Sequence, residues 1–152
     1  MRRTILAVIV VAMAATGCAA AATYPALTLP QNDGANADLG GVLHLRNAFL
    51  LSGTDPASPA PQQHLYAVLI NTGNQPTRLE QVTVDGGGSV QLAGPVTLPP
   101  NRPVGTGNKP IGTVTGIRGN TVPMTFSFRG FEPLRVNVPV KSRIGQYTGL
   151  TP

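Results

Sequence analysis

Apolar and polar side chains alternate with a period of two residues through much of the chain, from Val42 to Val140. This period predicts β-strands, because successive side chains of a strand point to opposite faces of a sheet. Turn-forming residues separate the short apolar segments about every 8–12 residues, and no segment after Cys18 carries a helical period. The predicted strands are Val42–Leu51, His64–Asn71, Leu79–Val84, Ser89–Leu92, Val96–Leu98, Ile111–Ile117, Thr121–Phe128 and Leu134–Val140. The pattern predicts an all-β fold, a single antiparallel β-sandwich of the immunoglobulin or cupredoxin type.

Two of these segments predict which side chains face the core. Strict alternation in the first segment places four large side chains on one face: Leu43, Leu45, Phe49 and Leu51. The second segment is apolar on both faces, which is typical of a central strand covered on both sides. If the two segments pair with His64 opposite Leu50, His44 lies roughly 20 Å from His64, at ~3.3 Å per residue. We therefore expect two separate surface histidines and no shared metal site.

The beginning of the chain carries a different pattern. Arg2-Arg3 precedes the apolar stretch Thr4–Ala15, and small residues lead through Gly17 to Cys18, the only cysteine. A charged start, a short apolar stretch and small residues before a cut are typical of a secretory signal peptide. The block resembles the lipobox of bacterial prolipoproteins, which implies cleavage between Gly17 and Cys18. It also implies a diacylglyceryl group on the Cys18 thiol, acyl chains such as palmitate, and anchoring to the extracytoplasmic face of the cell membrane.

Two other interpretations of this segment stay open. Thr4–Ala22 is, at ~20 residues, long enough to span a bilayer, although its second half is only weakly apolar. A simple secretory signal would instead be cut after an alanine and would leave Cys18 as a free thiol. Arg2-Arg3 also hints at a twin-arginine signal, but the residues around it match poorly, which favours Sec export.

The predicted organisation has four parts. Residues 1–17 form the lipoprotein signal peptide, and residues 18–38 form the lipidated N-terminus and a flexible tether rich in Ala, Thr, Pro and Asn. Residues 39–140 form the β-sandwich domain, and residues 141–152 form a polar tail that we expect to be frayed.

The chain has a formal net charge of +5, but two of these charges belong to the predicted signal peptide. The remaining basic residues are scattered and few aromatic residues accompany them, which argues against a nucleic-acid partner.

Catalytic groups are not evident in the sequence. Cys18 is expected to carry lipid, and the two histidines have no evident serine and aspartate beside them in the predicted strands. The Asp and Glu residues lie in the tether or in turns, or are isolated: Asp33, Asp38, Asp55, Glu80, Asp85 and Glu132. Gly105–Lys109 lacks the spacing of a phosphate-binding loop, and Gly86–Gly88 is typical of a turn. We therefore expect a protein that is not an enzyme and that holds no cofactor.

Several segments resemble a known group of proteins. Leu45–Leu51, the stretch Leu65–Leu79 with its Asn-Thr-Gly-Asn-Gln-Pro turn, and the final strand Val136–Val140 resemble actinobacterial cell-envelope lipoproteins of the LpqE-like type. The resemblance covers about Gly40–Val140. This group is distantly similar to periplasmic copper chaperones, whose small cupredoxin-like sandwich binds Cu(I) with two histidines and two methionines, one pair arranged as His-x-Met.

The copper motif itself is absent from this sequence. Arg46 follows His44 by two residues, Tyr66 follows His64 by two, and Met124 is the only methionine after the signal peptide. Cu(I) prefers soft ligands such as thioether sulfur, so one methionine provides little of the required chemistry. Met124 lies in an apolar alternation, and we expect it to be buried.

These features together predict a lipid-anchored, extracytoplasmic binding or scaffolding lipoprotein of the cell envelope. Its partners are the membrane, through Cys18, and an envelope protein or small ligand. We expect the contact surface at a loop-rich end of the sandwich that holds Asp55–Pro61 and Pro99–Pro110, because loops on a rigid scaffold commonly carry recognition. The alternative is a metal-handling relative of the copper chaperones that uses a non-standard site.

Overall fold

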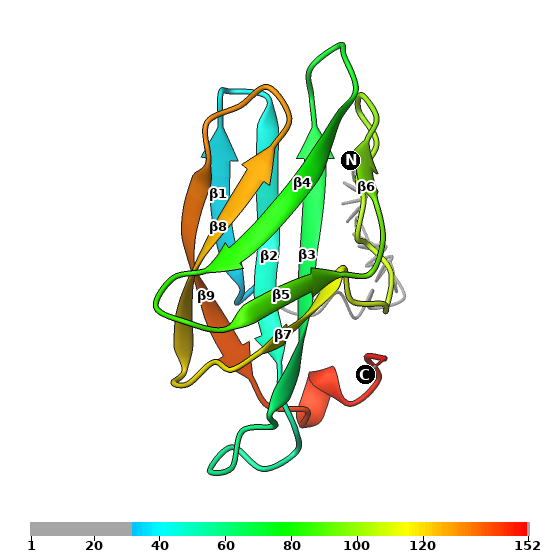
Figure 1. The fold of residues 1–152 in the computed structure, drawn as a ribbon. Helices are drawn as coiled ribbons and strands as arrows, with labels where there is room; N and C mark the ends of the chain where they lie inside the picture. Colours follow the sequence, from blue (N-terminus) through cyan, green and yellow to red (C-terminus); the bar gives the residue numbers. More distant parts are fainter. Residues whose placement is uncertain (1–31, 152) are drawn as a thin grey trace, which may run out of the picture.

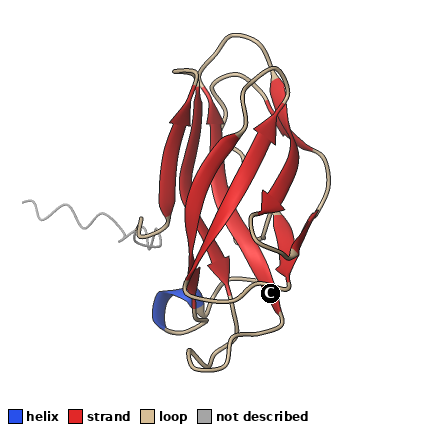
Figure 2. Ribbon diagram, turned by 60° about the vertical axis from the view of Figure 1, so that its left-hand side comes forward, coloured by secondary structure: helices blue, strands red, loops and turns tan. Residues whose placement is uncertain are grey.

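The structure, a computed structural model, describes residues 32–151. The predicted signal peptide and most of the predicted tether lie outside these residues. The described part is almost entirely strand and loop, with one short helical turn (Figures 1 and 2). The strands are β1 (Ala35–Leu39), β2 (Leu43–Leu51), β3 (Gln62–Asn71), β4 (Thr77–Val84), β5 (Ser89–Leu92), β6 (Val96–Leu98), β7 (Gly112–Thr115), β8 (Thr121–Phe128) and β9 (Leu134–Lys141), and the 3-10 turn η1 is Gly145–Tyr147. The predicted all-β sandwich is confirmed.

The strands form a sheet that folds over into two layers. The hydrogen-bonded order is β5-β7-β3-β2-β9-β8-β4-β6, and β1 pairs with β2. One layer holds β1, β2, β3, β7 and β5, and the other holds β9, β8, β4 and β6. The layers join where the end of β2 pairs in parallel with the end of β9, Leu50 opposite Val140 and Leu51 opposite Lys141. In residues 32–151, no helix has the length and apolarity needed to cross a membrane.

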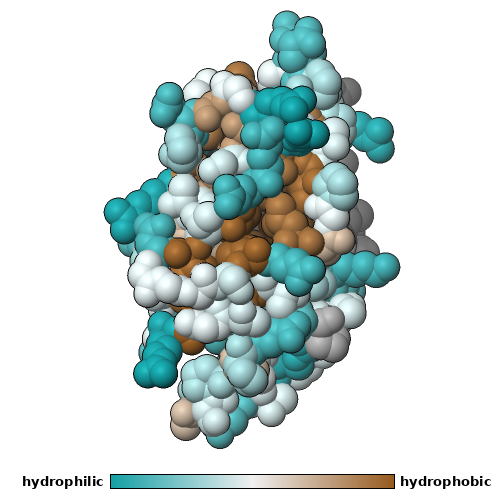
Figure 3. All heavy atoms as spheres, in the orientation of Figure 1, coloured by the Kyte–Doolittle hydropathy of each residue, from teal (hydrophilic) through white to brown (hydrophobic). Residues whose placement is uncertain are grey.

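The main core lies between the two layers. Its members come from the inward faces of the strands, and the largest fully buried ones are Leu45, Leu50, Leu65, Leu69, Leu98, Met124 and Phe126. Some partly buried apolar side chains of β4 and β5 pack against this core, among them Val84, Val90 and Leu92. On the face of the molecule drawn in Figure 3, apolar residues gather in the middle. Burial of alternating side chains from both layers is the packing that the sequence predicts for most strands.

A β-bulge in β2 makes the prediction for the first strand wrong in its second half. The pairing of β2 with β3 shifts between Arg46 and Phe49, and Asn47 within this interval has a φ of 50°. Asparagine tolerates this left-handed backbone better than most residues. A one-residue shift exchanges the two faces of a strand. Leu50 therefore enters the main core, whereas Phe49 and Leu51 pack on the outer face. His64 consequently lies opposite Leu51, and not opposite Leu50 as predicted.

Both predicted domain boundaries move outward in the structure. Residues 35–38 were predicted as tether, but they belong to β1. Ala35 and Ala37 alternate with polar residues there, and such small side chains make a weak apolar pattern. Lys141 was predicted as tail, but it belongs to β9. The tail continues into η1, where Tyr147 is buried against the outer face of the sheet. Packing of Tyr147, together with hydrogen bonds such as Thr151 N to Asn108 O, therefore holds a segment whose composition is polar.

The Pro99–Pro110 loop does not lie at one end of the sandwich. It runs along β3, because β7 pairs only with the first residues of that strand, Gln62–Leu65. The loop supplies partners for backbone groups beyond them: Asn101 N donates to Asn71 O at 2.6 Å, and Leu69 and Val104 form a bridge. The Asp55–Pro61 loop instead joins β2 to β3 at the end of the sheet. The predicted single loop-rich end is therefore wrong.

Candidate ligand-binding cleft

A second apolar cluster lies on the outer face of β2 and β3. It contains Phe49 and Leu51 from β2, Tyr66 from β3 and Tyr147 from η1. The rings of Phe49 and Tyr66 are stacked, with centroids 5.2 Å apart and planes at 8°. The ring of Tyr147 lies 5.2 Å from Phe49 at 56°, so the tail completes the cluster. We call these four residues the outer cluster.

Hydrogen bonds hold Asp33, near the start of the described residues, and the tail against the outer cluster. The hydroxyl of Tyr147 donates to Asp33 Oδ1 at 2.6 Å, and Lys141 Nζ lies 3.3 Å from Asp33 Oδ2. The hydroxyl of Tyr66 donates to the carbonyl oxygens of Asn108 and Thr151. The residues at Asp33 and at the end of the tail are therefore fixed relative to β3 and to the 105–108 segment.

A cleft of about 260 Å³ opens beside this cluster. Its lining surface is mainly apolar, and amide and hydroxyl side chains are among the residues that form it: Asn32, Asn47, Phe49, Tyr66, Ala67, Val68, Gly105, Thr106, Gly107, Asn108 and Leu150. These residues come from β2, β3, the Pro99–Pro110 loop, the tail and the segment that precedes β1. The cleft therefore exists only when five separate parts of the chain meet.

Glycine at position 105 is required for the loop to close on β3. Gly105 has a φ of +84°, and a Cβ atom there would collide with the carbonyl oxygen of Ala67. Glycine allows both the positive φ and the close backbone approach. The segment that begins at Gly105, which lacks the spacing of a phosphate-binding loop, thus has a structural role, because it forms one wall of the cleft.

Burial changes the pKa values of the groups around the outer cluster. Burial, reinforced by the hydrogen bond to Asp33, raises the pKa of Tyr147 to about 12. Burial also raises the pKa of Tyr66, although nearby Arg143 opposes this. For Asp33, burial acts to raise the pKa, but hydrogen bonds from Tyr147 and Lys141 outweigh it and lower the value. Both tyrosines are therefore neutral hydrogen-bond donors in the physiological pH range.

The two histidines occupy different parts of the molecule. His44 lies opposite Ile70, six residues from His64 along β3, so they do not share a site. His44 Nδ1 is 2.6 Å from Asp38 Oδ1, and its Nε2 is 3.2 Å from Thr72 Oγ1. The His44 bond and the Arg46 bond lower the pKa of Asp38. This exposed group joins β1 to β2 and to the turn after β3.

His64 is half-buried, and not a surface residue as predicted. Its Nδ1 atom is buried without a hydrogen-bond partner, and burial, together with the charge of Arg143, lowers its pKa. The bulge and the outer cluster explain this position, because His64 lies on the same face of β3 as Tyr66. His64 does not line the cleft.

Met124 lies in the main core, as the sequence predicts. Its exposed fraction is 0%, and it pairs with Val84 on β4 and with Val136 on β9. In the described range 32–151, no three His, Cys, Asp or Glu side chains gather as a metal ion would require. Gly17 and Cys18, the predicted cleavage and lipidation residues, lie outside the described residues.

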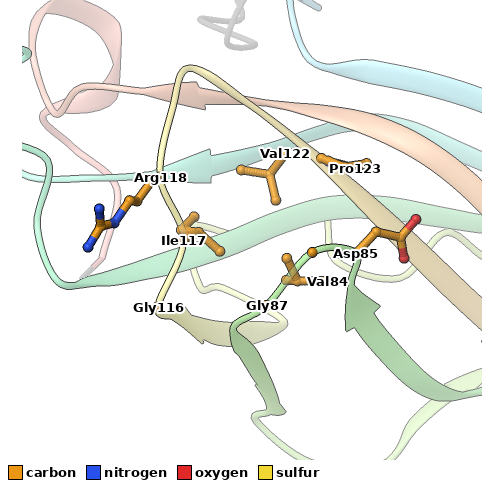
Figure 4. A pocket seen from close by; sticks show the side chains of 9 residues that line it. Val84, Asp85, Gly87, Gly116, Ile117, Arg118, Val122 and Pro123 are labelled. Carbon is orange, nitrogen blue, oxygen red and sulfur yellow. The ribbon is translucent and has the colours of Figure 1, made fainter.

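A second cavity, of about 270 Å³, lies at the end of the sandwich between the β4–β5 and β7–β8 connections. Its polar groups do not converge on one point. Asp85 is paired with Arg135 at 2.7 Å, and Figure 4 shows the Arg118 side chain pointing away from Val122 and Asp85. A ligand site usually needs a few polar groups aimed at one place. The cleft beside the outer cluster is therefore the stronger candidate.

Sequence reasoning predicted only one wall of this cleft, within Pro99–Pro110. The apolar outer face of the second predicted strand indicated that something covers it, but not that Tyr147 does so. Two of the three tyrosines in the chain, Tyr66 and Tyr147, lie in the outer cluster. Tyr147, an aromatic residue in an otherwise polar tail, was the available indication, since buried tyrosine needs both packing and a hydrogen-bond partner.

Solved PCuAC domains have the fold of this chain. "Apo PCuAC domain from PmoF1" matches with a TM-score of 0.56 and 20% identity over 70% of this chain and 98% of that chain. "Copper-bound PCuAC domain from PmoF2" matches with a TM-score of 0.55 and 16% identity over 70% and 97%. "Apo PmoF2 PCuAC domain" matches with a TM-score of 0.54 and 16% identity over 73% and 97%.

No protein-family model matches the sequence, and no curated protein matches it. The structural matches support the predicted distant similarity to periplasmic copper chaperones at the level of the fold. Membership of the LpqE-like group stays a prediction. With at most 20% identity to these structures, the chain has the cupredoxin-like β-sandwich of the PCuAC domains.

Proposed function

We propose that this protein is a lipid-anchored, extracytoplasmic binding lipoprotein of the cell envelope, and that it binds a small amphipathic ligand in the cleft without catalysing a reaction. The observation that carries the proposal is the cleft itself, with its aromatic and aliphatic lining and its amide groups. Small-molecule sites are commonly concave and mostly apolar, with a few polar groups that orient the ligand. The lining of this cleft matches that description.

The chemistry of the lining supports binding over catalysis. The polar side chains at the cleft are the amides of Asn32, Asn47 and Asn108, the hydroxyl of Thr106 and the phenol of Tyr66. Amides donate and accept hydrogen bonds but do not transfer protons near neutral pH. The phenol of Tyr66, whose pKa is raised, is a hydrogen-bond donor to backbone carbonyls. A general base would have to come from elsewhere.

Probe binding tests this proposal. The fluorescent probe 8-anilinonaphthalene-1-sulfonate carries an apolar ring system and one anionic group, and we expect it to bind to the cleft. Val68 is half-buried and lines the cleft, so Val68→Trp should fill the space and weaken probe binding at least about tenfold. Thr83→Trp on β4 adds the same side chain at an exposed position and serves as the control. Equal probe binding by the two variants would contradict the proposed site.

Membrane anchoring rests on Cys18 and the residues before it. Two acyl chains give stable membrane attachment, whereas one chain is marginal. Cys18→Ala should therefore leave unprocessed precursor or release the protein into the medium, which fractionation and mass spectrometry measure. A Cys18→Ala protein that is still cut at the same position and stays in the membrane would refute the lipoprotein assignment.

Copper handling is a second candidate, favoured by the likeness to a structure described as a copper-bound PCuAC domain. Such a function would need a site other than His-x-Met, because Met124 is buried in the main core and His44 and His64 lie apart. Cu(I) titration against a competing chelator decides between the candidates. We expect no stoichiometric uptake, and uptake that is lost in Met124→Leu would put copper handling first.

A further inference from the structure

We propose that the tail, residues 142–151, is an acid-released cover of the outer cluster: it stays docked while His64 is neutral and leaves when His64 takes up a proton. The inference goes beyond the proposed function, because the docking of the tail can be measured without any ligand. Only its consequence for the cleft rests on the proposed function.

His64 lies on the outer face of β3, beside the groups that hold the tail. It is opposite Leu51 on β2 and opposite Thr113 on β7, and Tyr66 follows two residues later on the same face. The Nδ1 atom of His64 is buried and has no hydrogen-bond partner. Protonation would turn this nitrogen into part of a charged ring with a buried, unpaired donor. Because an unpaired charged group costs more to bury than an unpaired neutral one, the docked state favours neutral His64.

Arg143 of the tail brings a positive charge to the same place. Burial lowers the pKa of His64 most, and the charge of Arg143 adds to this effect. The same charge acts on the pKa of Tyr66. The tail holds this residue in position, because Arg143 Nη1 donates to Leu150 O at 2.6 Å and Arg143 N donates to Gly53 O at 2.9 Å. A protonated His64 would therefore face a like charge for as long as the tail stays docked.

The other charged and titratable groups of this region do not compensate a charge on His64. Asp33 already accepts the Tyr147 hydroxyl at 2.6 Å and lies 3.3 Å from Lys141 Nζ. Asp55, in the connection between β2 and β3, is exposed and accepts a backbone N–H within its own turn. The two tyrosines of the outer cluster stay neutral near neutral pH, since burial raises the pKa of each. Release of the tail is then the way for the charged ring to reach water.

The tail is attached by few groups, so a modest cost can release it. One buried side chain, Tyr147, packs in the outer cluster, and the partly buried Leu150 packs against it. The end of the tail is held by a hydrogen bond from the Tyr66 hydroxyl to Thr151 O and by one from Thr151 N to Asn108 O. Terminal segments with few buried contacts open locally at a lower free energy than the whole domain. The main core should therefore stay closed when the tail leaves.

The direction of the pH effect follows from the two states of the tail. In the docked state the pKa of His64 is lowered, and in the released state it returns toward its ordinary value of 6.5. Docking is therefore fully stabilised above pH 6.5 and weakens as the pH falls below this value toward the docked pKa. One proton per tail sets the limit: from about pH 7.5 to about pH 5.5, the ratio of released to docked tail can increase at most about tenfold.

Release of the tail would also change the cleft. Leu150 lines the cleft, and the carbonyl group of Thr151 accepts the Tyr66 hydroxyl. Departure of the tail removes the Leu150 wall and frees the phenol, so a bound apolar ligand loses buried area. If the cleft is the ligand site, a ligand held near neutral pH would be given up in a mildly acidic medium.

Hydrogen exchange of the purified protein at about pH 7.5 and about pH 5.5 tests the inference, with protection factors used so that the intrinsic pH dependence of exchange cancels. Protection of residues 142–151 should fall by about threefold to tenfold at the lower pH, and protection of β8 should not change. His64→Gln keeps a polar side chain that does not titrate, and its tail protection should be the same at both pH values. His44→Gln removes the other histidine of the chain and is the matched control, which should behave like the unaltered protein.

Three results would overturn the inference: an equal fall of tail protection in His64→Gln, no fall in the unaltered protein, or a parallel loss of protection in β8. A second measurement needs no variant. The ring protons of His64 and the amide resonances of the tail should titrate with one common midpoint below 6.5 in nuclear magnetic resonance spectra. Separate midpoints, or a His64 midpoint at or above 6.5, would show that His64 does not control the tail.

Discussion

The main core and the outer cluster are built from the same strands, but they have different surroundings. The main core is closed between two layers and takes all its fully buried side chains from strands or their immediate flanks. The outer cluster has four members, lies on one face of the sheet under η1 and the tail, and borders an open cleft. Close packing on all sides leaves no space for a ligand. The comparison indicates that the closed core maintains the fold, while the partly covered outer face is available for binding.

The largest expected effects are losses of unfolding free energy when a phenylalanine in each region is replaced by alanine. Phe126 has an exposed fraction of 0% in the main core, and Phe126→Ala should lower the free energy of unfolding by about 3–5 kcal/mol. Phe49 is also buried, with an exposed fraction of 2%, but it borders the cleft, so Phe49→Ala should cost about 3 kcal/mol, at the lower end of that range, because residues beside a cleft can relax into the space. Urea denaturation measures both values. Equal losses would show that the outer cluster is as closed as the main core.

Substitutions of Tyr147 test how strongly the tail is attached. Tyr147→Ala removes one ring of the outer cluster and the hydrogen bond to Asp33, and it should cost about 2 kcal/mol. Tyr147→Phe keeps the ring and should cost about 1 kcal/mol, the usual value of one hydrogen bond. Tyr147→Ala should also increase hydrogen exchange in residues 142–151 and leave β8 protected. Loss of protection in β8 would mean that the two regions unfold together.

A conservative change at Met124 should have a smaller effect. Met124 fills space in the main core, and leucine has a similar volume. Met124→Leu should therefore change stability by less than ~1.5 kcal/mol and should leave probe binding in the cleft unchanged. Thermal unfolding and probe titration check these expectations. A large loss of binding would mean that the main core and the cleft are coupled.

The last effect comes from pH, and it concerns two groups at the outer cluster, Asp33 and Tyr147. The pKa of Asp33 is below its ordinary value of 3.8 in the folded protein, so its contribution is present above about pH 3.8 and is lost as the pH falls through the folded value. The pKa of Tyr147 is raised from 10.0 to about 12, so its contribution is present below pH 10 and is lost as the pH rises toward 12. Tyr147→Phe should reduce the alkaline loss relative to the unaltered protein and leave the part that comes from Tyr66, whose pKa is also raised. A persistent alkaline loss of the same size in Tyr147→Phe would assign it to another group.

Local pattern made the main core predictable. The alternation in Thr121–Phe128 and Leu134–Val140 reports directly on which side chains turn inward, because both strands are regular and pair without a shift. Met124 was therefore placed correctly from the sequence alone. The same rule was misleading in β2, because the bulge at Asn47 exchanges the faces of Phe49 and Leu50. A bulge depends on long-range pairing, which alternation within one strand does not record.

The sequence by itself determined the class of fold, the approximate strand boundaries, the buried position of Met124 and the separation of the two histidines. Period-two alternation and turn residues are local properties, and they act before distant segments meet. Only the tertiary structure decided the outer cluster and the cleft, because they require Asn32, the bulge, the 105–108 segment and the tail to meet on one face of β3. Contacts between residues as far apart as Asp33 and Tyr147 depend on the path of the whole chain, and no short window of sequence contains them.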